Sequence, residues 1–330
     1  MAKVMSMLFN KKGIFLTFIA ISIITALIII FTPSNTGFNK DIPAVKARVS
    51  NLNNYVLDLQ SVYLERVLQS SGTKAVNSLI KYMESQNKFL SNFEASFREV
   101  LLYGTISGQP IDNFIDPDIM TNNTYKDWIN KTIAIADNSF NIRTNITVND
   151  VKVYQTRPWF LTVDASVSLQ VTSETAAWAK TISVITDISI DRFYDPYYSI
   201  NTAGFYKNKI NKTSVLFAEW DLNKVKGHLK SGTYMHYDSS NAPNFIMRFT
   251  NTSGNSSCCG IESLVNPNKL AGIGSMESYA DDLFFNHSFQ NKCSQLFNAT
   301  SVWPDYKPLQ LDFTHLALYN LTSYSFVVAC

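Results

Sequence analysis

The feature that most constrains this chain is an apolar run over residues 14–31, from Ile14 to Phe31, which contains no charged side chain. Eighteen residues in an α-helix span about 27 Å, which is close to the roughly 30 Å hydrocarbon thickness of a bilayer. The run therefore predicts one membrane-spanning helix, with membrane lipid as its partner.

The charges around this run predict its orientation. Lys3, Lys11 and Lys12 precede it, and residues 1–31 contain no Asp or Glu. Because positive residues stay on the cytoplasmic side, we expect a cytoplasmic N-terminus and an extracellular bulk. A cleaved secretory signal is one alternative, although Thr32-Pro33-Ser34 matches a small-x-small cleavage site poorly. A buried core helix is the other.

The residues just before the run carry a resemblance. Lys11, Lys12 and Gly13 followed by apolar Ile14 resemble the processing site of archaeal class III, pilin-like signal peptides. The resemblance implies cleavage after Gly13, so that the mature chain would begin at Ile14. Pro33 departs from the pattern, because a pilin helix normally continues into a long stalk and proline ends or kinks a helix.

Composition limits the function classes. The chain has 28 basic and 26 acidic residues, and without Lys3, Lys11 and Lys12 the remaining 25 basic residues leave the external part near −1. There is no basic run, so we expect no nucleic-acid partner. An apolar content of 46% with 13% aromatics is typical of a globular domain with ample core, and the length suggests two or three modules.

Glycosylation sequons agree with an external location. From residue 122 onward the chain contains nine Asn-x-Ser/Thr sequons, more than twice the number that its composition predicts, and the earlier asparagines contribute none. Because an acceptor must lie outside the cytoplasm, we expect N-glycosylation; an Asn-rich and Ser/Thr-rich composition is the alternative. The acceptors would be Asn122, Asn130, Asn145, Asn211, Asn251, Asn255, Asn286, Asn298 and Asn320.

All four cysteines, Cys258, Cys259, Cys293 and Cys330, lie in the last quarter of the chain. An external compartment favours disulfides. Since a bond between adjacent cysteines would be strained, we expect Cys258 and Cys259 each to meet Cys293 or Cys330. A zinc site with His287 or His315 is the alternative, but the spacing matches no common ligand pattern.

Hydrophobic periodicity predicts an α+β fold. Residues 1–31 form the cytoplasmic stub and anchor, and residues 32–41 a linker. Residues 42–104 show apolar steps of three and four, which predict a long antiparallel helical hairpin that turns at residues 70–73.

Residues 105–200 predict a helix followed by an antiparallel β-meander. The helix is expected over 122–138, and the strands over 140–156, 161–172 and 178–190. The strongest signal is strict alternation of apolar and polar residues between Leu161 and Thr172, which is typical of a half-buried strand.

Residues 201–330 predict a second, smaller mixed α/β unit that contains the cysteines. Asp221–Lys230 is expected as a helix and Phe245–Phe249 as a strand. Asp312 is expected to cap a final helix, because an aspartate at this position satisfies free backbone N–H groups.

Several longer segments extend the resemblance over most of the chain. They are Ile188–Tyr198, Ala242–Phe249 and Gly260–Asn266. With the Lys-Lys-Gly anchor and the expected hairpin, they are similar to a group of archaeal pilin-like, membrane-anchored surface proteins. The resemblance implies a location and an architecture, and it carries no catalytic residue over to this chain.

A search for chemistry finds no established catalytic motif, so we expect no catalytic residue, no cofactor and no metal ion. There is no His-Glu-x-x-His pair, Gly-x-Ser-x-Gly elbow, phosphate loop or dinucleotide fingerprint. Asp112 with Asp116 and Asp118 could form a calcium loop, for which a solvated turn is the simpler interpretation. The aromatic residues could line a sugar- or peptide-binding face, although core packing is the commoner role; they are Trp159, Trp178, Trp220, Trp303 and the many tyrosines.

The sequence therefore predicts a non-enzymatic, single-pass glycoprotein of the cell surface. Its expected role is structural, in assembly or adhesion, with copies of itself or other pilin-like subunits as candidate partners. A sensor or ligand-binding ectodomain is the first alternative, and an extracellular hydrolase the second.

Overall fold

A computed structural model of the chain describes residues 21–22, 25, 41–140, 142–174, 176–236, 242–252, 256, 258–270, 278–286, 296–299, 309–324 and 326–327. These residues form two compact units, each assembled from separate stretches of chain. The first unit draws on Met1–Val67, Asp127–Asp150 and Ala165–Val184, and the second on Leu68–Lys126, Val151–Asp164 and Ile185–Cys330. The fold is mixed α+β with helices and antiparallel sheets, as the sequence predicts.

The predicted membrane anchor lies almost wholly outside the described residues. Of the run 14–31, only Ile21, Ser22 and Thr25 are described, and all three are helical; Thr25 Oγ1 donates to Ile21 O at 2.8 Å. Among the helices that the structure describes, none combines the length and the apolar character needed to cross a membrane.

The first helices run without the turn that the sequence predicts. Helix α2 (Asp41–Asp58), the π-helical turn η1 (Leu59–Tyr63) and α3 (Leu64–Gln86) follow one another directly, so residues 70–73 are helical. The prediction of a turn there was wrong because these small residues serve packing. A Cβ on Gly72 would lie 2.6 Å from Ile188 Cδ1, and buried Ser71 donates to Asn123 O at 3.0 Å.

The chain reverses later, between residues 87 and 92. Helix α4 (Phe93–Tyr103) begins at Asn92, whose side chain accepts a hydrogen bond from Ala95 N, and ends at Gly104 with a left-handed φ of +66°. A glycine tolerates this conformation without strain. A small hairpin follows, made of β1 (Thr105–Ile106) and β2 (Gln109–Pro110), with the 3₁₀ turn η2 (Ile111–Asn113) after it.

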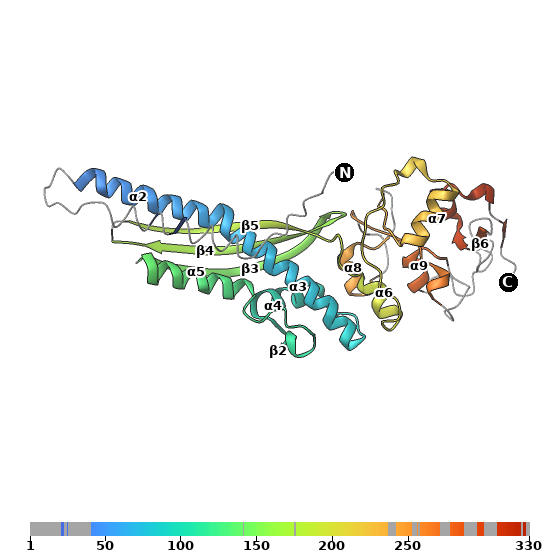
Figure 1. Cartoon of the computed structure of the whole chain (residues 1–330), viewed down its shortest axis with the longest axis horizontal. Coiled ribbons are helices and arrows are strands. Elements are labelled where there is room, and N and C mark those ends of the chain that lie inside the picture. Colours follow the sequence, from blue (N-terminus) through green and yellow to red (C-terminus); the bar gives the residue numbers. More distant parts are fainter. Residues whose placement is uncertain are drawn as a thin grey trace, which may run out of the picture. The chain divides into compact units, whose positions relative to one another are not determined.

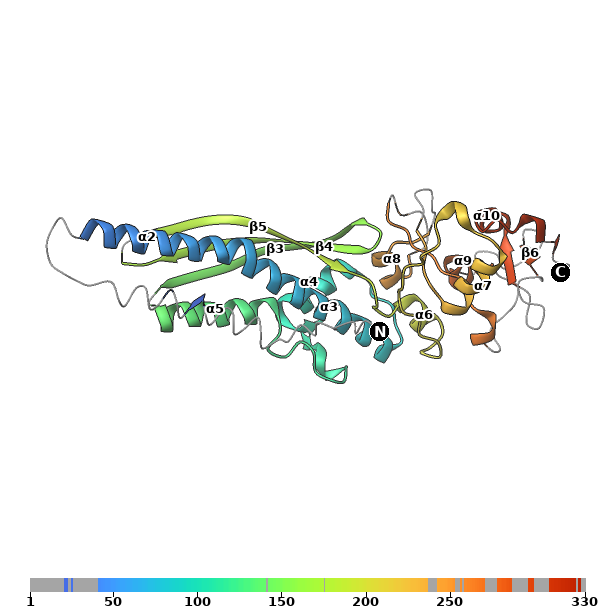
Figure 2. The same cartoon turned by 45° about the horizontal axis from the view of Figure 1, so that its top comes forward.

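The predicted meander is present. Strands β3 (Arg143–Arg157), β4 (Phe160–Thr172) and β5 (Ala177–Ser189) lie in the order β3-β4-β5. The apolar side of β4 is almost completely buried, which confirms the alternation; its members are Leu161, Val163, Ala165, Val167, Leu169 and Val171. In both views α2 and α5 (Tyr125–Phe140) run beside the strands (Figures 1 and 2).

Contacts within the first unit link these helices and strands. Tyr55 of α2 lies with its hydroxyl 3.5 Å from Thr144 Oγ1 of β3. Tyr63 of η1 donates to Trp128 O of α5 at 3.4 Å and lies 2.5 Å from Thr132 Oγ1. These contacts give hydrogen-bond partners to the hydroxyl groups that this packing buries.

The C-terminal part of the second unit consists of short elements. Its helices are α6 (Pro196–Asn201), α7 (Leu222–Ser231), α8 (Phe245–Phe249), α9 (Asp281–Asn286) and α10 (Phe313–Leu318), with 3₁₀ turns η3 (Phe217–Glu219), η4 (Pro267–Lys269) and η7 (Thr322–Tyr324). A further antiparallel sheet of three strands has the order β7 (Leu309–Asp312), β6 (Leu296–Ala299), β8 (Phe326–Val327).

Two predictions for this region are confirmed and one was wrong. Asp221 caps α7, and Asp312 caps α10. Each carboxylate accepts hydrogen bonds from two backbone N–H groups at the start of its helix. Phe245–Phe249, predicted as a strand, is helix α8, capped by the side chain of Asn244. The helical conformation places Phe245 and Phe249 one turn apart on the same buried side. The centroids of their rings therefore lie 5.1 Å apart.

Candidate functional site

A fully buried guanidinium lies within the second unit. Arg248 of α8 has no exposed side-chain surface, and its Nη1 donates to Asp195 Oδ2 at 2.7 Å and to Asp281 Oδ2 at 2.9 Å. Its Nη2 donates to Asp281 Oδ1 at 3.3 Å and also to the carbonyl oxygen of Ile261. One cation therefore binds two carboxylates, which are also fully buried.

Local structure places the carboxylate of Asp195. Asp195 is the N-cap of α6 and accepts a hydrogen bond from Tyr197 N at 2.9 Å, and Tyr234 Oη donates to its Oδ2 at 2.8 Å. The rings of Tyr197 and Tyr234 lie 5.4 and 5.6 Å from the guanidinium carbon of Arg248. Aromatic faces attract a cation electrostatically, so this cage compensates part of the cost of burying Arg248.

The burial of these charges shifts their proton affinities. Burial raises the pKa of Asp281 to about 7, against the opposing effect of Arg248. Burial disfavours the charge of Arg248, but Asp281 and Asp195 outweigh it and raise its pKa well above the usual value. The guanidinium is therefore charged at every physiological pH, whereas Asp281 exchanges its proton near neutrality.

A second buried network surrounds His315 of α10. Its Nδ1 lies 2.5 Å from Asp312 Oδ1, and its Nε2 lies 3.4 Å from Glu262 Oε2. Burial lowers the pKa of His315, but Glu262 and Asp312 outweigh burial and raise it well above the usual value. Both ring nitrogens can then donate, so His315 is an imidazolium between two carboxylates.

The network continues from Glu262 to the other side of the core. Tyr319 Oη donates to Glu262 Oε1 at 3.4 Å and lies 3.3 Å from His228 Nε2. His228 Nδ1 in turn lies 2.7 Å from Thr233 Oγ1. Burial lowers the pKa of His228 to about 3, so this histidine is neutral where His315 is charged.

The chemistry that this network can perform is limited by its internal pairing. Ser278 Oγ donates to Asp312 Oδ1 at 2.9 Å, so this serine is bonded to the carboxylate and not to His315. A serine nucleophile needs its hydroxyl bonded to the base, which this order of contacts does not provide. Within the part of the chain that the structure describes, no group of three His, Cys, Asp or Glu side chains is arranged to hold a metal ion.

Of the three aspartates considered for a calcium loop, Asp112 has structural partners for its carboxylate. Asp112 accepts hydrogen bonds from the backbone N–H groups of Ile119, Met120 and Thr121, at distances between 2.6 and 3.1 Å. Because backbone donors occupy its oxygens, Asp112 closes a loop and does not present a calcium ligand. Its neighbours in that proposal were Asp116 and Asp118, and Asp116 accepts a hydrogen bond from Lys81 Nζ through its carbonyl oxygen.

The sequon asparagines fall mainly on the surface. Those with exposed side chains are Asn122, Asn130, Asn145, Asn211, Asn251 and Asn320, whereas Asn298 is half-buried. Asn255 and the side chain of Asn286 lie outside the described residues. By contrast, the buried Asn208 and Asn266 are bonded to the core and are followed by no sequon.

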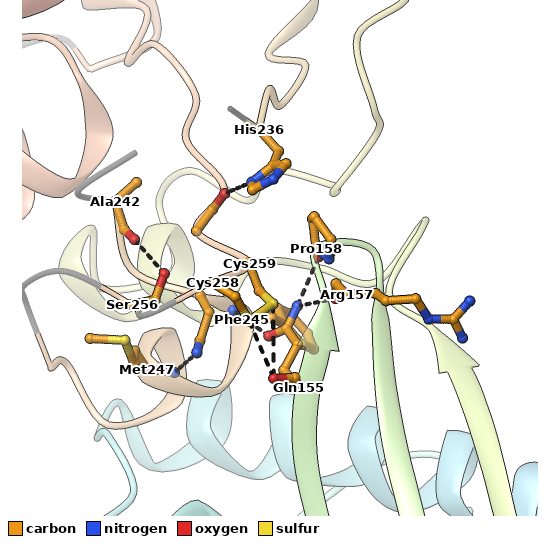
Figure 3. The surroundings of a disulfide bond; sticks show 12 residues. Gln155, Arg157, Pro158, His236, Ala242, Phe245, Met247, Ser256, Cys258 and Cys259 are labelled. Carbon is orange, nitrogen blue, oxygen red and sulfur yellow. Dashed lines mark hydrogen bonds between the residues drawn. A yellow bond between two sulfur atoms is a disulfide. The ribbon is translucent and has the colours of Figure 1, made fainter. Parts of the chain in front are cut away.

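The described cysteines are neighbours in the sequence, and their sulfurs lie within bonding distance of each other (Figure 3). The predicted pairing of each with Cys293 or Cys330 stays a prediction, because those partners are not among the described residues. Cys259 has a left-handed φ of +74°, and this tight turn places the two sulfurs side by side. Cys293 and Cys330 lie outside the described residues, as do the expected processing residues Lys11, Lys12, Gly13 and Ile14.

The turn that carries the disulfide lies beside the β3–β4 hairpin. The sulfurs of Cys258 and Cys259 lie 3.5 and 3.8 Å from the carbonyl oxygen of Gln155. The side chain of Gln155 accepts a hydrogen bond from Phe245 N at 3.1 Å and donates to Pro158 O at 2.8 Å (Figure 3). This amide therefore connects the hairpin tip to the start of α8.

The sequence search missed Arg248, and it considered His315 as an alternative zinc ligand but not as a partner of buried carboxylates. Arg248 stands in the apolar segment Phe-Ile-Met-Arg-Phe, and a lone charge among aromatic residues was the signal available. Its partners are 53 and 33 residues away, so the sequence alone could not reveal them. The chain matches no protein-family model, no curated protein and no solved structure.

Proposed function

We propose that the protein is a non-enzymatic, N-glycosylated cell-surface protein with a single N-terminal membrane anchor. Its role is structural, in assembly or adhesion of the pilin-like type, and it acts through its external surfaces. Residues 14–31 would form the anchor, with a cytoplasmic N-terminus and the two units outside the cell.

The observation that carries this proposal is that exposed and buried asparagines differ in whether they belong to a sequon. Six sequon asparagines are exposed, whereas Asn208 and Asn266, which are buried, belong to no sequon. A glycan needs a surface acceptor, because its bulk and polarity prevent burial. A composition bias alone would place sequons without regard to burial.

The buried networks favour a role that does not involve catalysis. The carboxylates around Arg248 and His315 are bonded to cations, hydroxyls or backbone N–H groups within the core. A buried network of this kind specifies one packing arrangement, which a structural subunit needs. The same network offers no exposed nucleophile and base pair to a substrate.

Two measurements on protein purified from its native cells test the proposal. N-terminal sequencing distinguishes the anchor types: Ile14 as first residue means pilin-type processing, Met1 or Ala2 an uncleaved anchor, and Asn35 or beyond a secreted product. Glycopeptide mass spectrometry should find glycans on exposed sequons. A chain with all nine sequon asparagines unmodified in the cytoplasmic fraction would contradict the proposal.

A further inference from the structure

The two buried networks of the second unit contain twice as many carboxylates as cations. Each cation lies between two carboxylates, so neither network has positive charge to spare. The members are Arg248 with Asp195 and Asp281, and His315 with Asp312 and Glu262. A further acidic side chain in the same core therefore has no cation of its own.

Asp282 is such a side chain. It follows Asp281 at the start of α9, and its Oδ1 is a buried atom without a hydrogen-bond partner among the described residues. Among the described side chains, no cation forms an ion pair with Asp282. It faces Arg248, His315 and Glu262 electrostatically, so it lies near both cations while other carboxylates bind them.

Full ionisation of this core would leave five carboxylates against two cations. Excess charge in a core costs free energy unless protons neutralise it. Burial raises the pKa of Asp281 to about 7 and that of Asp282 to about 6. The aspartate pair therefore binds protons in an acidic medium and gains negative charge as the medium becomes neutral.

The neighbouring groups do not offset this change of charge. Burial raises the pKa values of the three nearby tyrosines, which stay neutral. Burial works against the charges of Arg248 and His315, but their carboxylate partners outweigh it and raise both pKa values. The groups that face the aspartate pair are Asp195, Tyr197 and Tyr198 at α6, Tyr234, Arg248 of α8, Glu262, and His315 of α10.

Helix α9 joins the aspartate pair to the aromatic core. The buried ring of Phe285 lies 5.5 Å from the ring of Tyr197 and 4.9 Å from that of Tyr198. Asp281 N donates to Ser263 O at 3.0 Å, directly where α9 begins. Because α9 has only six residues, two new charges at its start act on the whole element.

We propose that Asp281 and Asp282 form a proton-dependent switch that controls the docking of α9. Protonation neutralises the pair, and α9 then packs against α6 and α8. Loss of the protons leaves unbalanced charge in the core and favours release of α9 while the remainder of the second unit stays folded. The switch is a property of the folded chain, so it does not depend on the proposed location or on the adhesion role.

Hydrogen–deuterium exchange of the purified full-length protein in detergent, read by mass spectrometry of peptides, tests the switch at about pH 5 and pH 8. Correction for the intrinsic pH dependence of exchange leaves the frequency of local opening. The test variant, Asp281→Asn/Asp282→Asn, imitates the protonated pair. The matched control is Asp191→Asn, which changes a side chain of the same unit that is 49% exposed.

In the parent, we expect α9 to open roughly tenfold or more often at the higher pH, because ionisation of the pair favours the open state. Peptides of α4, in the same unit, should show no such change. The test variant should open equally often at both pH values to within about twofold, and Asp191→Asn should behave like the parent. Asp282→Asn alone leaves the bonds of Arg248 in place, and it should reduce the pH dependence in part.

Equal opening of α9 at both pH values in the parent would overturn the inference, as would an unchanged pH dependence in both aspartate variants. Calcium chloride added at the higher pH provides a further arm. If Ca²⁺ closes α9 as acid does, the pair binds a cation instead of protons and the proton switch is rejected. The parent protein alone decides the first outcome, so the test does not depend on whether a variant folds.

Discussion

Arg248 Nη1 lies 2.7 Å from Asp195 Oδ2, and neither side chain has any exposed surface. The two residues are 53 positions apart in the sequence, and they join the start of α6 to α8. Buried ion pairs gain little net stability over apolar packing, but removing one partner leaves an uncompensated charge in the core. This asymmetry makes Arg248 a position at which a substitution should strongly destabilise the second unit.

Replacement of Arg248 tests this relationship. We expect Arg248→Met to lower the free energy of unfolding by about 3–5 kcal/mol, because Asp195 and Asp281 lose their cation. The exposed Arg192→Met should change it by only about 0.5 kcal/mol or less. Urea denaturation of the full-length protein in detergent measures both.

A compensated variant separates loss of charge balance from loss of packing. Arg248→Met combined with Asp195→Asn and Asp281→Asn removes all three charges, and it should recover part of the lost stability. If Arg248→Met is no more destabilising than Arg192→Met, the Arg248 network does not hold the second unit together.

The raised pKa of Asp281 predicts how stability depends on pH. Its folded-state pKa of about 7 lies above the ordinary value of 3.8, so the folded protein holds this proton more tightly than the unfolded chain. Its contribution to stability is therefore fully present below pH 3.8 and is lost as the pH rises through about 7. Burial raises the pKa of Asp282 to about 6, which acts in the same direction.

Unfolding midpoints in urea, measured across this pH window, check the prediction. The decline in stability with rising pH should be shallower in Asp281→Asn than in the parent, because the amide has no proton to lose. Identical slopes for Asp281→Asn and the parent would contradict the assignment.

The two buried histidines should differ in charge at neutral pH. His228, with its pKa lowered to about 3 by burial, should be a neutral imidazole, whereas His315 should be an imidazolium. Nitrogen chemical shifts of labelled histidine, assigned with His228→Gln and His315→Gln, report these states. Titration of His228 near its usual pKa of about 6.5 would show that its site is open to water.

A side chain added at Gly72 would clash with Ile188. Gly72→Ala places a Cβ 2.6 Å from Ile188 Cδ1, and we expect a loss of about 1–3 kcal/mol in unfolding free energy. Ile188→Val removes that Cδ1 atom, so the double variant should be more stable than Gly72→Ala alone. Denaturation of the two single variants and the double variant measures the coupling.

Gly227 provides the matched control for this experiment. It also lies within a helix, α7, but an added Cβ there would meet nothing within 4 Å. Gly227→Ala should therefore stabilise the protein by about 0.5–1 kcal/mol through helix propensity alone. If Gly72→Ala stabilises the protein in the same way, the close approach of α3 to Ile188 is absent in solution.

The sequence by itself determined the features that depend on neighbouring residues. The alternation between Leu161 and Val171 predicted β4, because side chains of a strand point to opposite faces in turn. Asp221 and Asp312 predicted the starts of α7 and α10, since a cap bonds N–H groups two or three residues ahead. The sequon asparagines were also identified from local sequence, and exposure of six of them is consistent with their proposed role.

Only the tertiary structure decided the features that depend on distant partners. Ser71 and Gly72 read locally as a turn, but Asn123 and Ile188 give them a place inside a helix. Phe245–Phe249 is short enough to read as a strand, and burial of two aromatic rings on one side makes it a helix. Arg248 acquires its role from carboxylates far along the chain, because a buried charge is stable only where folding brings its partners to it.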